Sequence, residues 1–159
     1  MEKIPEFPLL LLSLIQAPST EPFIKMSAAL LFKNFIKKNW PESEQEPSKI
    51  SSQIAAELKR QIVDVMLMSP SNIRVQLSQA ISEIAKHDFP ERWPDLLSQL
   101  LARMSPQNFD VNNGILHTAH SVFKRYKHEF RSDELFLEIK YVLEQFANPL
   151  LELFRVLLF

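Results

Sequence analysis

One ten-residue segment, Asp88–Leu97, constrains the fold of this chain more than any other part of the sequence. It reads DFPERWPDLL and holds two prolines, Pro90 and Pro94. A proline removes a hydrogen bond from a helix interior but is tolerated in a first turn. One amphipathic helix must therefore end in this segment and another must begin. Phe89 and Trp93 are large apolar side chains at that corner, and we expect them to hold the two helices together.

The composition predicts an all-α fold. Gly114 is the single glycine among 159 residues, whereas eleven residues are proline. Glycine-rich phosphate loops and tight hairpin turns are therefore excluded. The chain has no cysteine, so disulfides and thiolate metal sites are excluded, which suits a reducing compartment. A formal net charge of −1 argues against nucleic acid as the main partner, because binding to the phosphate backbone generally requires a basic excess.

No segment of the sequence has the length expected of a membrane span. The apolar run Leu9–Ile15 is broken by Ser13 and is much shorter than the roughly 20 residues that a spanning helix needs. Acidic residues flank Lys3 and no clean cleavage site follows the run, so we do not expect a secretory signal. The sequence predicts instead an amphipathic helix that begins near Pro8, and no membrane insertion.

Apolar spacing, prolines and capping residues together predict about seven helices. Their expected ranges are 8–16, 20–38, 48–69, 70 to the corner at 88, 91–104, 110–128 and 132 onward. We expect Ser69 to cap the fourth helix, with Pro70 as its first residue, Asp110 to cap the sixth and Ser132 the seventh. Pro149 is expected to kink or split the last helix. An acidic segment at 42–46 is expected to form the longest loop.

Three of these helices have a clear apolar face that we expect to be buried. The expected core residues are Ile50, Ile54, Leu58, Ile62 and Val65 in the third helix, Ile73, Leu77, Ala80, Ile81 and Ile84 in the fourth, and Val111, Ile115, Ala119, Val122 and Tyr126 in the sixth. The other flank of the sixth helix carries Gly114, Thr118 and Ser121, small residues that would let a neighbouring helix approach closely.

The helices fall into two interleaved series. The expected starts are near Pro8, Ile50, Glu91 and Ser132 in the first series and near Thr20, Pro70 and Asp110 in the second. The first series repeats every 40-odd residues, which is the period of HEAT or armadillo repeats, and the second has a similar spacing. We therefore predict an α-solenoid in which residues 1–159 form a single array of three to four HEAT repeats. Solenoids bind partners and seldom carry out chemistry.

Both ends of the chain are strongly apolar. A solenoid normally finishes in a repeat with a polar outer face, but residues 8–12 read PLLLL and residues 154–159 read FRVLLF. An uncovered apolar surface of this kind promotes aggregation unless something packs on it. We therefore expect an array that is incomplete at both ends, as a fragment of a longer superhelix. A homodimer through these ends is the alternative.

Residue patterns typical of catalysis or metal binding are scarce. His117 and His120 share a helix face and could suggest a metal site together with His128, but no carboxylate completes the set at ligand spacing. A nucleophile elbow needs glycines that the chain lacks. The acidic pair Asp133 and Glu134 lies in a helix first turn, where it complements the helix dipole. We expect no metal, no cofactor and no enzymatic activity.

Polar residues on the second series of helices are the candidate binding residues. They lie at the spacing of a helix face on each helix, and side by side they would form one surface, which we call the polar wall. Its members are Lys33, Asn34, Lys37, Lys38, Gln76, Gln79, Glu83, Asn113, His117, His120, Lys124 and Lys127. The wall is either a binding surface or the solvated face of the array.

Three segments resemble the importin-β (karyopherin) superfamily. FKNFIKKNW at 32–40 and DFPERWPDLL at 88–97 look like its amino-terminal HEAT repeats. NGILHTAHSVFKRYKHEF at 113–130 is more specific. Together with PLLLL at 8–12 and the residues from 134 onward, it resembles the branch of the superfamily that returns importin-α to the cytoplasm. The resemblance covers nearly the whole chain and fades after Arg155.

The resemblance implies part of a nuclear export receptor that shuttles between nucleus and cytoplasm. Family members are long superhelices of HEAT repeats that hold Ran in its GTP form through amino-terminal repeats, with cargo enclosed by other parts of the arch. Here the implied cargo is importin-α, and nuclear-pore proteins are further implied partners.

In this family the second helix of each repeat lines the concave surface, which makes the polar wall a candidate contact for Ran or importin-α. The alternative is a generic α-solenoid scaffold whose binding ignores the nucleotide on Ran.

Overall fold

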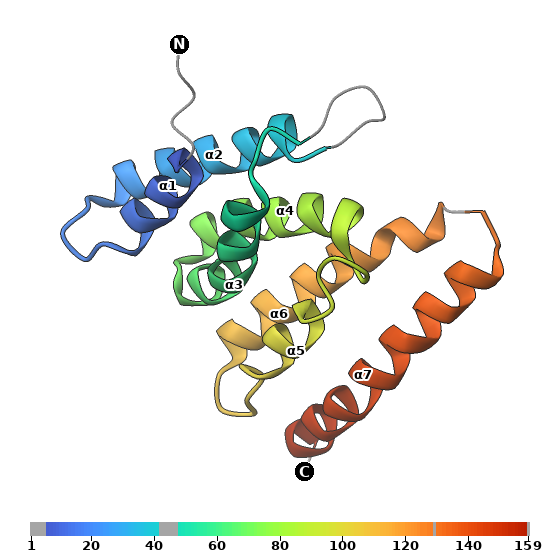
Figure 1. The fold of residues 1–159 in the computed structure, drawn as a ribbon. Coiled ribbons are helices and arrows are strands. Elements are labelled where there is room, and N and C mark those ends of the chain that lie inside the picture. The colour runs from blue at the N-terminus through green and yellow to red at the C-terminus, as the bar shows by residue number, and fades with distance from the viewer. Residues whose placement is uncertain (1–5, 42–47, 129, 159) are drawn as a thin grey trace.

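The computed structural model describes residues 6–41, 48–128 and 130–158, and the regular structure in these segments is helical (Figure 1). The helices are α1 (Phe7–Gln16), α2 (Pro22–Asn39), α3 (Ser52–Met68), α4 (Ser71–Asp88), α5 (Leu96–Leu101), α6 (Phe109–Phe123), the 3-10 helix η1 (Lys124–Lys127) and α7 (Asp133–Leu158). The predicted all-α class is therefore confirmed. None of the helices in the described segments is long and apolar enough to cross a membrane.

The helices pack in two layers, in chain order from α1 at one end to α7 at the other (Figure 1). In the first layer, α1 contacts α3, α3 contacts α5, and α5 contacts α7. In the second layer, α2 contacts α4, and α4 contacts α6. Each of the pairs α1–α2, α3–α4 and α5–α6 also packs across the layers. The two interleaved series predicted from the sequence are the two layers of this α-solenoid.

The apolar core lies between the layers. Its largest fully buried side chains are Leu12, Phe32, Ile36, Leu58, Ile62, Met66, Leu77, Ile81, Ile84, Leu96, Leu97 and Leu100. The apolar faces predicted for the third and fourth helices are buried throughout. On the sixth, Val111 and Tyr126 are half-buried instead. Val111 lies in the first turn of α6, and Tyr126 lies in η1 with its hydroxyl turned to a carboxylate.

Local hydrogen bonds shift the first residues of α3 and α4 from their expected positions. Ser51 caps α3 by accepting a hydrogen bond from the backbone N–H of Ile54 at 3.4 Å, so α3 begins at Ser52 rather than near residue 48. The expected cap of α4 is wrong, because the Ser69 hydroxyl donates to the carbonyl of Val65 at 2.6 Å. Pro70 takes the cap position, and α4 begins one residue later than expected.

The fifth helix is much shorter than expected, six residues instead of a run from 91 to 104. The backbone N–H groups of Arg92 and Trp93 both donate to the carbonyl of Asp88, at 2.7 and 2.8 Å. This turn occupies the residues that were expected to begin the helix. Pro94 has no N–H to continue a helical ladder from there, and regular helix starts only at Leu96.

The ends of the last two α-helices also differ from the prediction. Asn108, not Asp110, caps α6, since its Oδ1 accepts from the N–H of Val111 at 3.1 Å. The end of the sixth helix is wound as η1 rather than as α-helix. Ser132 caps α7 as expected, accepting from the N–H of Leu135 at 3.1 Å. Pro149 was expected to kink or split the last helix; α7 continues through it, so the split is wrong. The expected acidic loop at 42–46 lies outside the described residues.

Candidate functional site

The second layer places the predicted polar wall on three neighbouring helices. The Nζ of Lys33 on α2 donates to Oε1 of Gln76 on α4 at 2.7 Å. On α6, the Thr118 hydroxyl donates to Oγ of Ser78 on α4 at 2.9 Å. These two contacts tie α2 to α4 and α4 to α6, so the stripes that the sequence predicted on each helix lie side by side.

Most members of the polar wall are open to solvent. Those exposed are Asn34, Lys37, Lys38, Gln79, Asn113, His117, His120, Lys124 and Lys127. The half-buried members are Lys33, Gln76 and Glu83, and Glu83 pairs with Lys86 at 2.8 Å. Asn34 and Lys38 lie apart from the others, because they line a pocket with Phe7 on the α1 side of α2. The structure therefore brings together the members on α4, α6 and η1 with Lys33 and Lys37.

A buried arginine holds α4 against α6 beneath the wall. The guanidinium of Arg74 donates to both carboxylate oxygens of Asp110, at 2.8 and 2.7 Å, and to the carbonyl of Ser69 at 2.9 Å. This hydrogen bonding lowers the pKa of the Asp110 carboxyl below its ordinary value. Asp110, expected as a helix cap, instead links two helices that lie 36 residues apart in sequence.

Gly114 makes room for this arginine. A Cβ atom added at Gly114 would lie 2.7 Å from Cδ of Arg74, closer than real side-chain contacts allow. Gly114 and Thr118 are buried against the neighbouring helices, whereas Ser121 is half-buried. The predicted flank of small residues is therefore the packing face of α6 at its first two positions. A small pocket of about 110 Å³ remains above it, lined by polar side chains that include Asn113 and His117.

A second arginine holds the other end of α4. The guanidinium of Arg125 in η1 donates to the carbonyls of Ala85 and Lys86, both at 3.3 Å, and to that of Phe89 at 3.1 Å. It also forms an ion pair with Glu138 of α7. The hydroxyl of Tyr126 donates to the same carboxylate at 2.7 Å, and burial together with this hydrogen bond raises the tyrosine pKa.

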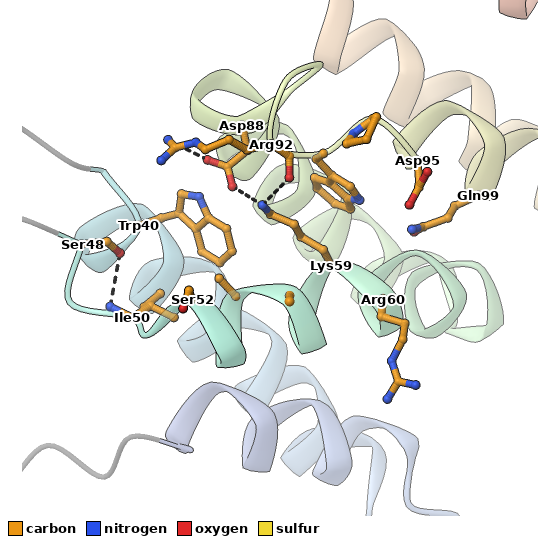
Figure 2. Close-up of a pocket in the computed structure, with 14 residues that line it drawn as sticks. Trp40, Ser48, Ile50, Ser52, Lys59, Arg60, Asp88, Arg92, Asp95 and Gln99 are labelled. Carbon is orange, nitrogen blue, oxygen red and sulfur yellow. Dashed lines mark hydrogen bonds and ion pairs between the residues drawn. The ribbon is translucent and has the colours of Figure 1, made fainter.

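The Asp88–Leu97 segment forms one wall of a pocket of about 480 Å³ on the first layer, opposite the amino-terminal half of α3 (Figure 2). Figure 2 shows the ammonium of Lys59 between the carboxylate of Asp88, with which it forms an ion pair, and the carbonyl of Arg92, to which it donates at 2.8 Å. The ammonium also lies 5.7 Å from the ring centroid of Trp40.

Asp88 is buried and pairs with Arg92 as well, at 3.0 Å. As predicted, Phe89 and Trp93 are buried at this corner. The segment is thus a packing corner whose charges compensate one another.

The sequence did not predict three structural contacts beneath and beside the candidate site, namely those of Lys59, Arg74 and Arg125. For Arg74 a signal was present, since a cation directly follows Ile73 on the apolar face of α4. No pattern pointed to the other two, because their partners lie 29 and 13 residues away. Among the described residues, no group of three His, Asp or Glu side chains could hold a metal ion. The chemistry gathered on the polar wall is that of hydrogen bonding and positive charge.

Two family models match the chain. Residues 1–68 match the importin-beta N-terminal domain, and residues 122–158 match the Cse1 family. The first match covers α1 to α3, and the second runs from the end of α6 to the end of α7.

Curated relatives agree with these matches. Exportin-2 of Oreochromis niloticus is 52% identical over 149 residues, and Exportin-2 of Homo sapiens is 51% identical over the same length. Each alignment covers 94% of this chain and 15% of the relative, so the chain spans about a seventh of their length.

A solved structure, the exportin Cse1 in its cargo-free, cytoplasmic state, matches 98% of this chain and 17% of its own chain, with a TM-score of 0.88 and 42% identity. On these grounds the chain belongs to the importin-β superfamily, as a HEAT-repeat region similar to the amino-terminal part of Exportin-2.

Proposed function

We propose that this chain acts within a nuclear export receptor that binds Ran in its GTP form and returns importin-α from the nucleus to the cytoplasm. The observation that carries the proposal is the identity of about half of all residues with Exportin-2 over 94% of the chain. Because this identity extends over helices of both layers, it supports a binding surface shared with Exportin-2 as well as a shared fold.

The polar wall is the proposed contact for Ran or importin-α. Its members on α4 and α6 are mainly hydrogen-bonding groups, the amides of Gln76, Gln79 and Asn113 and the imidazoles of His117 and His120. They stand on helices whose spacing is fixed by Arg74 and by the bond between Ser78 and Thr118. A rigid array of such groups suits a partner that is itself folded, because little conformational entropy is lost in the receptor.

The proposed mechanism is coupled binding. Ran in its GTP form and importin-α would bind the complete receptor cooperatively, each favouring the same curvature of the array. Hydrolysis of GTP on Ran would then release both in the cytoplasm, and the receptor would shuttle between the two compartments through contacts with nuclear-pore proteins. The array itself supplies binding surfaces in this scheme and performs no chemical step.

Calorimetry with Ran tests the proposal directly. The purified chain is titrated with Ran bound to a non-hydrolysable GTP analogue and with Ran bound to GDP, after circular dichroism has verified cooperative melting. We expect affinity for the GTP form to exceed that for the GDP form by at least about tenfold, which corresponds to 1.4 kcal/mol. Equal affinity for the two forms would support the generic scaffold instead.

A pair of matched variants locates the contact. His117→Ala with His120→Ala removes two exposed side chains from the polar wall, and we expect weaker binding to GTP-bound Ran. Lys140→Ala with Glu144→Ala removes an exposed pair from α7 on the other layer, and we expect unchanged binding. The wall is not the Ran contact if both variants bind as the parent chain does.

A further inference from the structure

Charge is unevenly divided between the two layers. The second layer, comprising α2, α4, α6 and η1, contains nine Lys and Arg residues and three Asp and Glu residues. The whole chain, by contrast, carries a formal net charge of −1. The second layer is therefore strongly basic, and the remainder of the chain is acidic.

Each carboxylate of the second layer is already paired. Glu83 pairs with Lys86, Asp88 with Lys59 and Arg92, and Asp110 with Arg74. Four exposed lysines on the same layer, Lys37, Lys38, Lys124 and Lys127, have no carboxylate within ion-pair distance among the described residues.

These unpaired cations lie toward one edge of the second layer, with Lys38 on the α1 side of α2. The carboxyl ends of α2, α4 and α6 point to the same side of the array (Figure 1). On α6 and η1 the polar wall becomes basic toward that side, from Asn113 to Lys124 and Lys127. We define the basic edge as the four unpaired lysines, Lys37, Lys38, Lys124 and Lys127, together with Lys86, whose ammonium pairs with Glu83.

The helix dipole explains only part of this arrangement. A cation in the last turn of a helix is stabilising by about 0.3–1 kcal/mol at an exposed site. That effect accounts for a basic residue at the end of each helix. It does not account for the complete lack of acidic residues in α2, which holds four lysines in 18 residues. Uncompensated positive potential across three helix ends attracts an anionic partner.

We propose that the basic edge docks an acidic surface segment of a protein partner, one rich in Asp and Glu. The proposal rests on the proposed function, since it names the chemistry of the partner surface that the polar wall receives. Charge complementarity fixes the orientation of such a partner: its acidic segment lies across the carboxyl ends of α2, α4 and η1. Its neutral polar surface then faces Gln76, Gln79 and Asn113.

The surroundings of the edge favour protein over nucleic acid. Binding of single-stranded nucleic acid relies on exposed aromatic side chains for base stacking. The exposed aromatic residues on the helices of this layer, Phe23 and Phe109, lie at the opposite ends of α2 and α6. Phe130, three residues after Lys127, is exposed near the edge, but one aromatic side chain does not form a platform for successive bases. A long polyanion would also extend beyond the edge toward the acidic remainder of the chain, where it would be repelled.

A short poly-Glu peptide is the probe that tests the edge. We expect the chain to bind this peptide, and binding to weaken by about tenfold between low and physiological salt as the charges are screened. In a variant with Lys37, Lys38, Lys124 and Lys127 all changed to Glu, we expect the affinity to fall at least about tenfold. The same four changed to Gln give a milder second variant, for use if the reversal alters the melting curve.

The control is Lys140→Glu with Arg155→Glu, which reverses two exposed cations on α7 of the other layer. We expect it to bind the peptide as the parent chain does. A parent chain that does not bind poly-Glu, or edge variants that bind it unchanged, would overturn the proposal. So would a single-stranded oligonucleotide that displaces the peptide and binds more tightly.

The Ran titration separates this inference from the proposed function. Binding of poly-Glu through the edge, with no preference between the two nucleotide forms of Ran, would leave the basic edge standing and reject the transport function. A preference for GTP-bound Ran without poly-Glu binding would support the transport function and reject the basic edge as a docking site.

Discussion

Two arginines hold opposite ends of α4, and they do so in different surroundings. Arg74 reaches out from the amino end of α4 to Asp110, a carboxylate whose side chain is 71% exposed. Arg125 reaches in from η1 to the carboxyl end of α4, and its partner Glu138 is only 18% exposed. Arg74 connects two helices of one layer, whereas Arg125 connects both layers, since Glu138 belongs to α7.

The two arginines differ in how well water could solvate the partner carboxylate if the arginine were removed. Without Arg74, the Asp110 carboxylate can turn to water. Without Arg125, Glu138 loses its cation in a place where water reaches it poorly, and three backbone carbonyls lose a donor. An uncompensated buried charge destabilises a protein far more than a broken surface pair. The burial of the partner, rather than the residue type, therefore decides the energetic weight of each contact.

The largest effect is expected for Arg125→Met. We expect it to lower the free energy of unfolding by about 3 kcal/mol, because it leaves Glu138 without a cation and strips the carboxyl end of α4 of its donor. Urea denaturation followed by circular dichroism measures this value. Adding Glu138→Gln to the variant should recover part of the loss. A loss below about 1 kcal/mol would mean that Glu138 is effectively solvated.

Arg74→Met is expected to have a smaller effect, a loss of about 1.5 kcal/mol from the hydrogen bonds to Ser69 and Asp110. Asp110→Asn should lose less than this, because the guanidinium keeps its bond to the Ser69 carbonyl. The same urea titrations give both values. If Arg74→Met is as destabilising as Arg125→Met, the burial of the partner carboxylate does not decide the energetic weight of the two contacts.

Gly114→Ala is expected to change stability in opposite directions in the parent chain and in an Arg74→Ala variant. In the parent chain the new Cβ would press on Cδ of Arg74, which is held in place at its guanidinium, so we expect a loss of stability. In an Arg74→Ala background this obstacle is gone, and alanine should stabilise the helix by about 0.5–1 kcal/mol over glycine. A double-mutant cycle measures the coupling. Additive effects would show that Arg74 does not require the glycine.

The smallest effect concerns acid stability. Because Arg74 lowers the pKa of Asp110 in the folded chain, this carboxylate contributes stability above its unfolded pKa of about 3.9. That contribution is lost as the pH falls through the lowered folded value. Asp110→Asn should therefore flatten the decline of stability below about pH 4. Glu152→Gln, at an exposed pair on α7, serves as the control and should leave the decline unchanged.

Local signals explain why much of the fold was predictable from the sequence. Pro22 begins its helix within two residues of the expected start, and Ser132 caps α7 through a bond to a residue only three positions away. Such contacts depend on neighbours in the chain, and a single sequence displays them. The stripes of the polar wall were predictable for the same reason, since helical spacing is a local property.

The features that escaped prediction depend on distant residues. The short α5 follows a turn around the carbonyl of Asp88, and its corner is held by Lys59 from α3. Asp110 has the residue type and position of a helix cap, yet its partner is Arg74, 36 residues earlier. A local pattern cannot rank a cap against an ion pair whose second member lies on another helix.

Three contacts between α4 and the continuous segment α6–η1 join residues that lie equally far apart in the sequence. Arg74 meets Gly114, Ser78 meets Thr118 and Arg125 meets Ala85, each pair separated by 40 residues. One residue inserted or deleted inside either helix would change the register of every contact that follows it. We therefore expect changes of length among relatives to fall in the segment between the helices. We also expect a substitution at one of these contacts to be accompanied by a compensating change 40 positions away.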